Sequence, residues 1–174
     1  MKKFLMLLLS VVAGIFATSA KVTLVDGDIA AFYNAEVNVL FDDGCAFLEG
    51  ENATADEFFQ RQDHIAYARF LLDLEASHDY FVNAINEGGQ FLITNKAQRL
   101  LLKIKVDRLR IGRIEKPARM SGVIELVDKE TGFVLCKLSM QNVKGKRSFI
   151  FKGRAAKAYM KLARELMKLI KSKI

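Results

Sequence analysis

The chain has 174 residues, of which 51% are hydrophobic, 13 are Phe and only one is Pro, a composition that excludes a disordered or low-complexity protein. The formal net charge is +7, but it is unevenly distributed: residues 21–100 carry five basic and 14 acidic side chains, and residues 101–174 carry 20 basic and six acidic ones. The two halves therefore either complement each other after folding or include a basic surface that binds anions.

Residues 1–20 have the three parts of a bacterial secretory signal. Two lysines precede an apolar stretch, residues 4–16, and four small residues follow it. The stretch is too short for a lasting membrane anchor, and no later one reaches the ~20 apolar residues of a transmembrane span. No cysteine lies where a lipid anchor would need it. We expect cleavage after Ala20, export to the periplasm or the extracellular space without a lipid anchor, and a mature chain of one domain, residues 21–174.

Two short strands are expected first in the mature chain, at residues 22–26 and 36–41. Each ends in a cluster of Asp and Gly, residues 26–28 and 42–44, which favours turns. These carboxylates could in principle gather around a calcium ion, but position five of an EF-hand loop starting at Asp26 is an alanine. We interpret them as turn residues and expect no metal or other cofactor.

Two helical segments follow. Thr54-Ala-Asp-Glu57 is a capping box and predicts a helix that begins after Thr54. Apolar residues then recur at helical spacing as far as Leu74, and Ser77 is a candidate second N-cap that would open a shorter helix ending before Gly88-Gly89. The aromatic residues of this region are expected to form a core face.

Residues 100–111 are predicted to form the central strand of a sheet. Apolar and polar residues alternate up to Asp107, after which the phase slips by one residue, which predicts a β-bulge near Asp107-Arg108. A short strand at residues 91–94 precedes it. Residues 122–128 and 133–140 follow and predict a β-hairpin around a Gly-containing turn.

The chain ends in an amphipathic helix, residues 154–173, with an apolar stripe and basic residues around the rest of its surface. We therefore expect an α+β fold: a mixed, mainly antiparallel sheet centred on residues 100–111, with two long helices packed on one face. One core is predicted to contain the following six residues: Phe70, Ile104, Val106, Leu138, Tyr159 and Leu166.

No catalytic signature is present. The two histidines, His64 and His78, are 14 residues apart, so on an unbroken helix they would lie roughly 21 Å from each other, too far to share one metal ion. No metal-binding spacing, nucleophile elbow or phosphate-binding glycine loop occurs. We do not expect an enzyme.

Cys45 and Cys136 are the only cysteines. An even number of cysteines in an exported protein suggests a disulfide. The pairing would need the turn that holds Cys45 to reach the predicted hairpin. The alternative is that Cys136 is a small apolar core residue. The sequence leaves both interpretations open.

The basic C-terminal half is the best candidate for a binding site. A helix of this kind can lie on an anionic membrane, but here the sheet has an apolar face that the helix is expected to cover. The docked helix could still present a basic face to an anionic lipid or polysaccharide. Export and the lack of a recognition motif argue against nucleic acid. The candidate anion-binding residues are Lys144, Lys146, Arg147, Lys152, Lys157, Lys161, Arg164 and Lys168.

Three motifs carry a resemblance to known proteins. Residues 25–29 (VDGDI), 36–42 (EVNVLFD) and 81–86 (FVNAIN), with Ala158-Tyr159 in the last helix, resemble a family of small, uncharacterised exported bacterial proteins, a domain of unknown function. The order of elements is more loosely similar to the amino-terminal domain of TolB-type envelope proteins. The resemblance implies an α+β envelope module with a binding or assembly role and supplies no catalytic residues. The missing lipid-anchor cysteine departs from many lipoproteins of this kind.

The expected function is therefore that of a non-catalytic exported envelope protein that binds another envelope protein, through a sheet edge or the acidic N-terminal half. The alternative is binding of anionic envelope lipid or polysaccharide through the basic C-terminal half.

Overall fold

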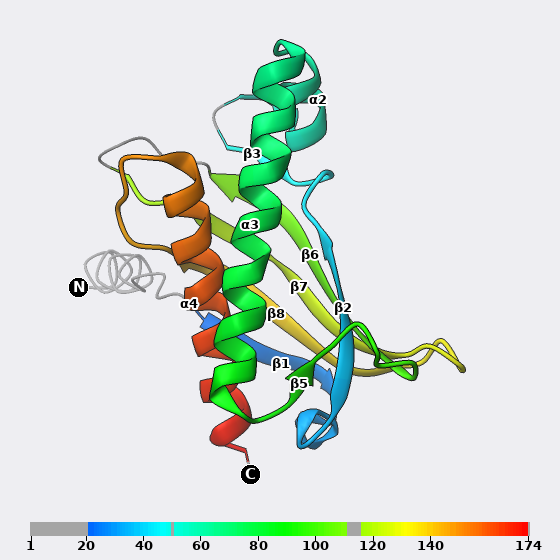
Figure 1. Ribbon diagram of the computed structural model, residues 1–174. Coiled ribbons are helices and arrows are strands. Elements are labelled where there is room, and N and C mark those ends of the chain that lie inside the picture. The colour runs from blue at the N-terminus through cyan, green and yellow to red at the C-terminus, as the bar shows by residue number, and fades with distance from the viewer. Residues whose placement is uncertain (1–20, 50, 111–115, 174) are drawn as a thin grey trace, which may run out of the picture.

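The computed structural model describes residues 21–49, 51–110 and 116–173, so the expected secretory signal lies outside the described residues. The described strands form one sheet in the order β1-β8-β7-β6-β2-β5, and both long helices lie on one of its faces (Figure 1). The strands are β1 (Lys21–Gly27), β2 (Glu36–Asp42), β3 (Phe47–Leu48), β4 (Ala53–Thr54), β5 (Leu92–Ile93), β6 (Leu100–Arg110), β7 (Arg119–Asp128) and β8 (Val134–Lys144). The helices are η1 (Ile29–Phe32), α2 (Ala55–Gln60), α3 (His64–Gly88) and α4 (Phe151–Lys171).

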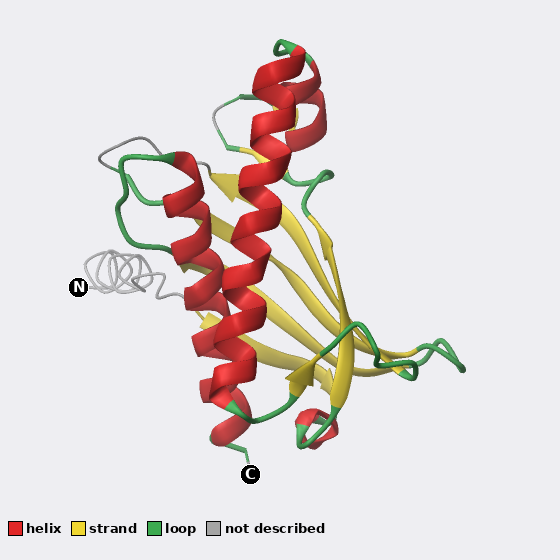
Figure 2. Cartoon of the chain, viewed as in Figure 1, coloured by secondary structure: helices red, strands yellow, loops and turns green. Residues whose placement is uncertain are grey.

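The sheet is mainly antiparallel, as expected. β1, β8, β7 and β6 are antiparallel neighbours, whereas β2 runs parallel to β6 and to β5. Beyond the end of β2, the short β3 takes its place beside β6 and pairs with β4. The α+β class and the placement of two long helices on one face are both confirmed (Figure 2).

The β-bulge predicted in the central strand is present. The pairing of β6 with β7 shifts register between Val106 and Arg108, so Asp107 is the additional residue on β6. Val106 and Leu109 are consequently both buried although they are three residues apart. The partner strand carries Gly122 opposite Val106, where an added Cβ would lie 2.0 Å from the carbonyl oxygen of Lys105.

The helical region differs from the prediction at Ser77. The break lies earlier, between α2 and α3, where the Asp63 side chain accepts the amide hydrogen of Ala66 as an N-cap. Ser77 lies inside α3, is fully buried, and donates its hydroxyl to the carbonyl of Asp73 over 2.6 Å. The hydroxyl is thus satisfied within the helix, and the apolar face continues past it to Phe81, so nothing ends the helix there. The capping box at Thr54 and the stop at Gly89, which has a φ of 68°, are as predicted.

The short β5 lies at the edge of the sheet, beside β2. Its outward-facing backbone groups are those of Ile93, and the Asn86 side chain occupies both: Oδ1 accepts from the Ile93 amide at 2.8 Å, and Nδ2 donates to its carbonyl at 3.1 Å. An amide side chain from α3 therefore occupies the position of a further strand at this edge.

One hydrophobic cluster lies between the sheet and the helices. It contains all six residues predicted to share a core, of which Ile104, Leu138 and Leu166 have no exposed surface. This prediction is confirmed.

Candidate functional site

The eight candidate anion-binding residues lie on α4, on the connection before it and at the end of β8. Four of them form a stripe along α4, because they are spaced by four, three and four residues: Lys157, Lys161, Arg164 and Lys168. The other four are Lys144 at the end of β8, Lys146 and Arg147 in the connection, and Lys152 in the first turn of α4. This connection passes directly against the helix at Gly145, where a Cβ would lie 2.7 Å from the backbone nitrogen of Ala158.

Two of these cations already have partners. Lys157 donates to the carbonyl of Arg147 at 3.0 Å, which ties the connection to the helix, and Lys161 pairs with Glu165 at 2.6 Å. The exposed or half-exposed remainder consists of Lys144, Lys146, Arg147, Lys152, Arg164 and Lys168.

The N-terminus of α4 carries positive charge without compensation. Its N-cap is Ile150, which makes no side-chain cap hydrogen bond, and its first turn contains no acidic residue. Arg154 is only 8% exposed; one guanidinium nitrogen donates to the carbonyls of Ser148 and Phe149 at 2.9 and 3.1 Å, and its Nε has no partner. From the sequence, Arg154 was expected to lie with the other basic residues outside the apolar stripe of this helix, and this expectation was wrong. Its spacing of four residues from Ala158 was the signal that it lies on the buried stripe.

The cysteines do not form the disulfide that was one of the two interpretations. Cys45 is free and exposed, and Cys136 is free and buried on the inner side of β8. The physical reason is distance: Cys45 lies between β2 and β3, and both of these strands are separated from β8, which holds Cys136, by β6 and β7, about 14 Å. Burial, and then the charges of Asp28 and Asp26, raise the pKa of the Cys136 thiol to about 11. Cys136 is therefore an inert core residue.

Sequence reasoning missed a buried polar cluster where β2 meets both helices. Asp43 accepts hydrogen bonds from the Tyr159 hydroxyl, on α4, and makes a 2.6 Å contact with His78 Nε2, on α3. Phe41 stacks on the His78 ring with the centroids 3.9 Å apart. Burial and the neighbouring Asp43 carboxylate raise the pKa of Tyr159 well above its ordinary value. Because Asp43 and Tyr159 are 116 residues apart in sequence, no local pattern could have revealed the contact.

This cluster lies almost entirely inside the fold. Tyr159 is 2% exposed and Asp43 is 5% exposed. His78 is the most accessible member, with 18% of its side chain exposed. The cluster joins the end of β2 to α3 and α4, and its cost of burial is offset by the hydrogen bonds within it.

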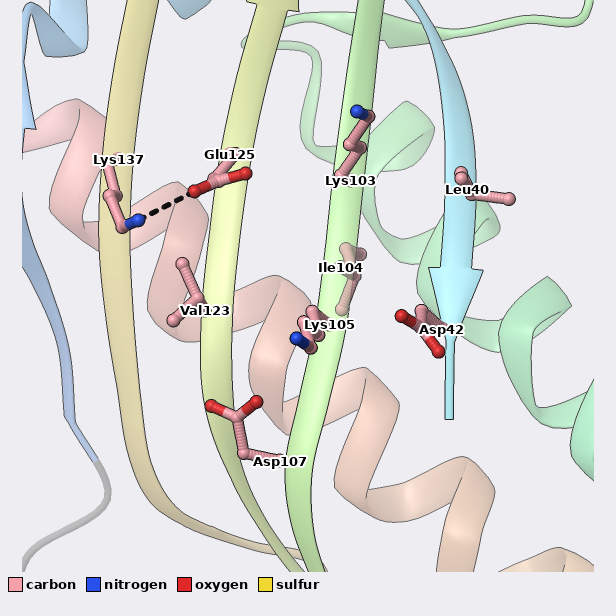
Figure 3. Close-up of a pocket in the computed structure, with 9 residues that line it drawn as sticks. All are labelled: Leu40, Asp42, Lys103, Ile104, Lys105, Asp107, Val123, Glu125 and Lys137. Atoms are coloured by element: carbon pink, nitrogen blue, oxygen red, sulfur yellow. Dashed lines mark ion pairs between the residues drawn. The ribbon is translucent and has the colours of Figure 1, made fainter. Parts of the chain in front are cut away.

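The open face of the sheet, on the side away from the helices, holds a shallow pocket of 410 Å³ (Figure 3). Its polar side chains come from four neighbouring strands: Asp42, Lys103, Lys105, Asp107, Glu125 and Lys137. Opposite charges alternate across the strands, and Lys137 pairs with Glu125 at 2.8 Å. The hydrogen bond to Glu125, followed by its charge, raises the pKa of Lys137. Lys137–Glu125 is the ion pair that the described residues form in this pocket, and the other charged side chains face solvent, as on the solvated face of an antiparallel sheet.

A projecting helical arm is the second surface that sequence reasoning did not single out. We use this name for α2 and residues 64–72 of α3, which extend beyond the sheet (Figures 1 and 2). The Phe59 and Phe70 rings stack with centroids 3.4 Å apart and hold α2 against α3. On the outer side, Ile65 is 82% exposed and Leu72 is 65% exposed. They are seven residues apart and so lie on one stripe of the helix.

Within the described part of the chain, no group of three or more His, Cys, Asp or Glu side chains is arranged to hold a metal ion. Among the helices described there, none combines the length and the apolar character that crossing a membrane requires.

No protein-family model and no curated protein matches the chain. Among solved structures, the chain is similar to PelC from Paraburkholderia phytofirmans, described as a dodecamer, at 14% identity and a TM-score of 0.46, over 84% of this chain and 97% of that one. A point variant of the same protein gives a TM-score of 0.45. Protein XCC0632 from Xanthomonas campestris, of the DUF330 family, is similar at 12% identity and a TM-score of 0.35, over 85% and 90% of the two chains. None of these carries a function over to this chain, and the similarity to the TolB-type domain is not shown by them.

Proposed function

We propose that the protein is an exported, non-catalytic module of the bacterial envelope that binds another protein through the helical arm. The observation that carries this proposal is the 82% exposure of Ile65, with Leu72 at 65% on the same stripe. Neither side chain helps to cover the sheet. Apolar residues that are spaced by seven along a helix are the pattern by which one helix packs against another.

The charge around the stripe defines the partner further. Over residues 55–79, which include the arm and the part of α3 that follows it, six acidic side chains outnumber two arginines, Arg61 and Arg69. The acidic residues are Asp56, Glu57, Asp63, Asp73, Glu75 and Asp79. A partner that complements this surface is an amphipathic helix with apolar anchors flanked by Lys or Arg. In this proposal, the acidic N-terminal half of the chain binds the partner.

Photo-crosslinking in cells tests the arm. A photoreactive residue in place of the exposed Ala68, between the two apolar side chains, is expected to give one discrete adduct with a partner. The same residue in place of the exposed Asn83, where α3 covers the sheet, is the positional control. The adduct should disappear when Ile65→Ser and Leu72→Ser are combined and persist with Phe133→Ser, which removes a comparably exposed apolar group, 71% exposed, from the β7–β8 turn. No adduct at Ala68, or one that survives the double substitution, would refute the arm as the binding surface.

Export is a separate part of the proposal. Cell fractionation of the full chain should yield a protein that begins at Lys21 outside the cytoplasm. Uncleaved protein recovered only from the cytosol would contradict export while leaving the arm to be judged by crosslinking.

A second candidate function is the binding of anionic envelope lipid or polysaccharide. It is favoured by one observation: the eight candidate basic residues lie on α4, on the connection before it and at the end of β8, and among the described residues only Lys157 and Lys161 of the eight bond to a carbonyl or a carboxylate.

A further inference from the structure

The N-terminus of α4 has no side-chain cap from its N-cap residue. The first backbone N–H groups of any helix lack partners within it, and here Ile150 supplies no side-chain acceptor. The helix dipole adds positive charge at this end, and Lys152 and Arg154 in the first turn add more. A carboxylate would be the ordinary stabilising residue at such a position, and none is present in the first turn.

Arg154 independently indicates that an anion belongs there. Its side chain is more than nine-tenths buried, and its guanidinium lies beside the start of the helix, because one nitrogen donates to the carbonyls of Ser148 and Phe149. The Nε of this guanidinium is the buried side-chain nitrogen without a partner among the described residues. A buried charged donor left unpaired is costly, and guanidinium groups prefer oxyanions that accept several hydrogen bonds.

Two exposed apolar side chains border this helix end. Phe149 is 83% exposed and Ile150 is 64% exposed, and the cations Lys146 and Arg147 precede them with Ser148 in between. A phosphate ion or a soluble acidic polysaccharide gives an exposed Phe-Ile pair nothing to contact. The interface of a bilayer does, because acyl chains accept the apolar side chains while lipid phosphates accept hydrogen bonds from the cations.

We propose that this end of the molecule docks on an anionic phospholipid surface. One lipid phosphate is received at the N-terminus of α4, by backbone N–H groups of the first turn and by Arg154 and Lys152. Phe149 and Ile150 enter the headgroup boundary, and Lys146 and Arg147 contact neighbouring phosphates. The inference deepens the second candidate function, on which it rests, and it does not depend on the helical arm.

Sedimentation with lipid vesicles is the first test. The mature chain is mixed with vesicles of phosphatidylcholine containing about a third of phosphatidylglycerol, or of phosphatidylcholine alone, at low and at physiological salt. We expect binding only to the anionic vesicles, weakened by salt because charges near the surface are screened over about 10 Å. Replacing Lys146→Gln or Arg147→Gln should each weaken binding about fivefold. The control Lys96→Gln, an exposed cation distant in sequence, should leave binding unchanged.

The apolar pair distinguishes a lipid surface from other anions. Phe149→Ala with Ile150→Ala should weaken vesicle binding at least about tenfold, while Phe133→Ala should not. Alanine at position 150 adds no side-chain cap, and all three side chains are exposed, so the unfolding midpoint should stay nearly unchanged. Absence of binding to anionic vesicles at low salt would overturn the proposal. So would vesicle binding that the double substitution leaves unchanged, which would indicate a purely electrostatic surface.

A spectroscopic measurement tests the helix end without relying on a variant that could fail to fold. The Nε resonance of Arg154 in the intact labelled protein should shift when a short-chain phosphatidylglycerol is added, and not with the matching phosphatidylcholine. An equal shift with millimolar inorganic phosphate, together with no effect of the Phe149 and Ile150 substitutions on vesicle binding, would assign the site to a free anion instead. If the resonance shifts with none of these ligands, the N-terminus of α4 does not bind a phosphate group and the proposal is overturned.

Discussion

The two long helices lie on the same face of the sheet but use it differently. α4 is buried against the sheet along its length, from Arg154 to Ile170. α3 is buried only from Phe70 onwards, and its first turns extend past the sheet with α2. The apolar residues of α4 are therefore explained by packing within the chain. Packing within the chain does not explain the apolar residues Ile65 and Leu72 of α3, because both are exposed.

Small residues explain how the two helices can approach each other and the sheet. α4 presents alanines such as Ala158 and Ala163, both without exposed surface. α3 presents Gly88 opposite Met167, where a Cβ would meet the sulfur at 1.9 Å. Close contact at this end therefore fixes the pair, while at the opposite end of α3 the Phe70 ring stacks on Phe59 of α2.

The largest effect is expected from breaking the packing of α4. Leu166→Ala removes a side chain without exposed surface from the core and should lower the free energy of unfolding by about 2–5 kcal/mol. Leu72→Ala, on the projecting part of α3, should lower it by less than about 0.5 kcal/mol. Chemical denaturation measures both. A loss below half a kcal/mol for Leu166→Ala would mean that α4 is not docked.

The buried joint between both helices should give the next largest effect. Tyr159→Phe removes the hydroxyl that donates to Asp43 and leaves one buried carboxylate oxygen without that donor, at a cost of about 1–3 kcal/mol. A double-mutant cycle with His78→Phe measures the coupling, since the two residues share Asp43. Additive losses would show that the three side chains do not act as a unit.

The same tyrosine should make the protein sensitive to alkali. Its pKa is raised in the folded state by burial and by Asp43, so the folded protein keeps the hydroxyl proton where the unfolded chain loses it. Its contribution to stability is therefore full below the ordinary tyrosine pKa of about 10, and it falls as the pH rises from there towards the raised pKa. Unfolding curves at increasing pH should show this loss in the native protein and a smaller one in Tyr159→Phe. Identical profiles would contradict the raised pKa.

The thiols report on how completely α4 closes the core. Cys45, which is exposed, should react with a thiol reagent at neutral pH, while Cys136 should react only after unfolding, because burial hides it and raises its pKa to about 11. Mass spectrometry of the modified protein separates the two sites. Rapid labelling of Cys136 would show that α4 opens readily. Failure of both to react even in denaturant would show that they are paired.

Hydrogen exchange should reveal the smallest difference, one of dynamics within a single helix. The amides of residues 66–72 of α3 lie outside the sheet and should exchange faster than those near Phe81 and than those of α4. Equal protection along α3 would indicate that the arm is stabilised as strongly as the core.

Most of the fold could be predicted from the sequence because its signals are local. Alternation along β6, the slip at Asp107 and the capping box at Thr54 each depend on a few neighbouring residues, and all are confirmed. The prediction of a helix start at Ser77 was wrong, because the helix satisfies that hydroxyl internally and tertiary packing keeps the helix continuous.

The candidate sites were less predictable, because they depend on contacts between residues that are distant in sequence. Asp43 reads as a turn residue in sequence, and only the fold brings it to His78 and Tyr159. The basic residues were identified by composition, but their grouping depends on the close passage of Gly145 over α4. Ile65 is exposed because the sheet ends before it reaches this part of α3. The spacing of apolar residues along a helix does not predict where a sheet ends.

The contact of Asn86 with Ile93 has a consequence for how the protein behaves at high concentration. An open sheet edge is a template on which further chains can add as strands and grow into fibres. At β5 the two backbone groups that would start such growth are already occupied by one side chain. Polymerisation through this edge would first have to displace the Asn86 side chain, which α3 holds in place. A helix residue therefore ends the sheet at β5, a strand of only two residues.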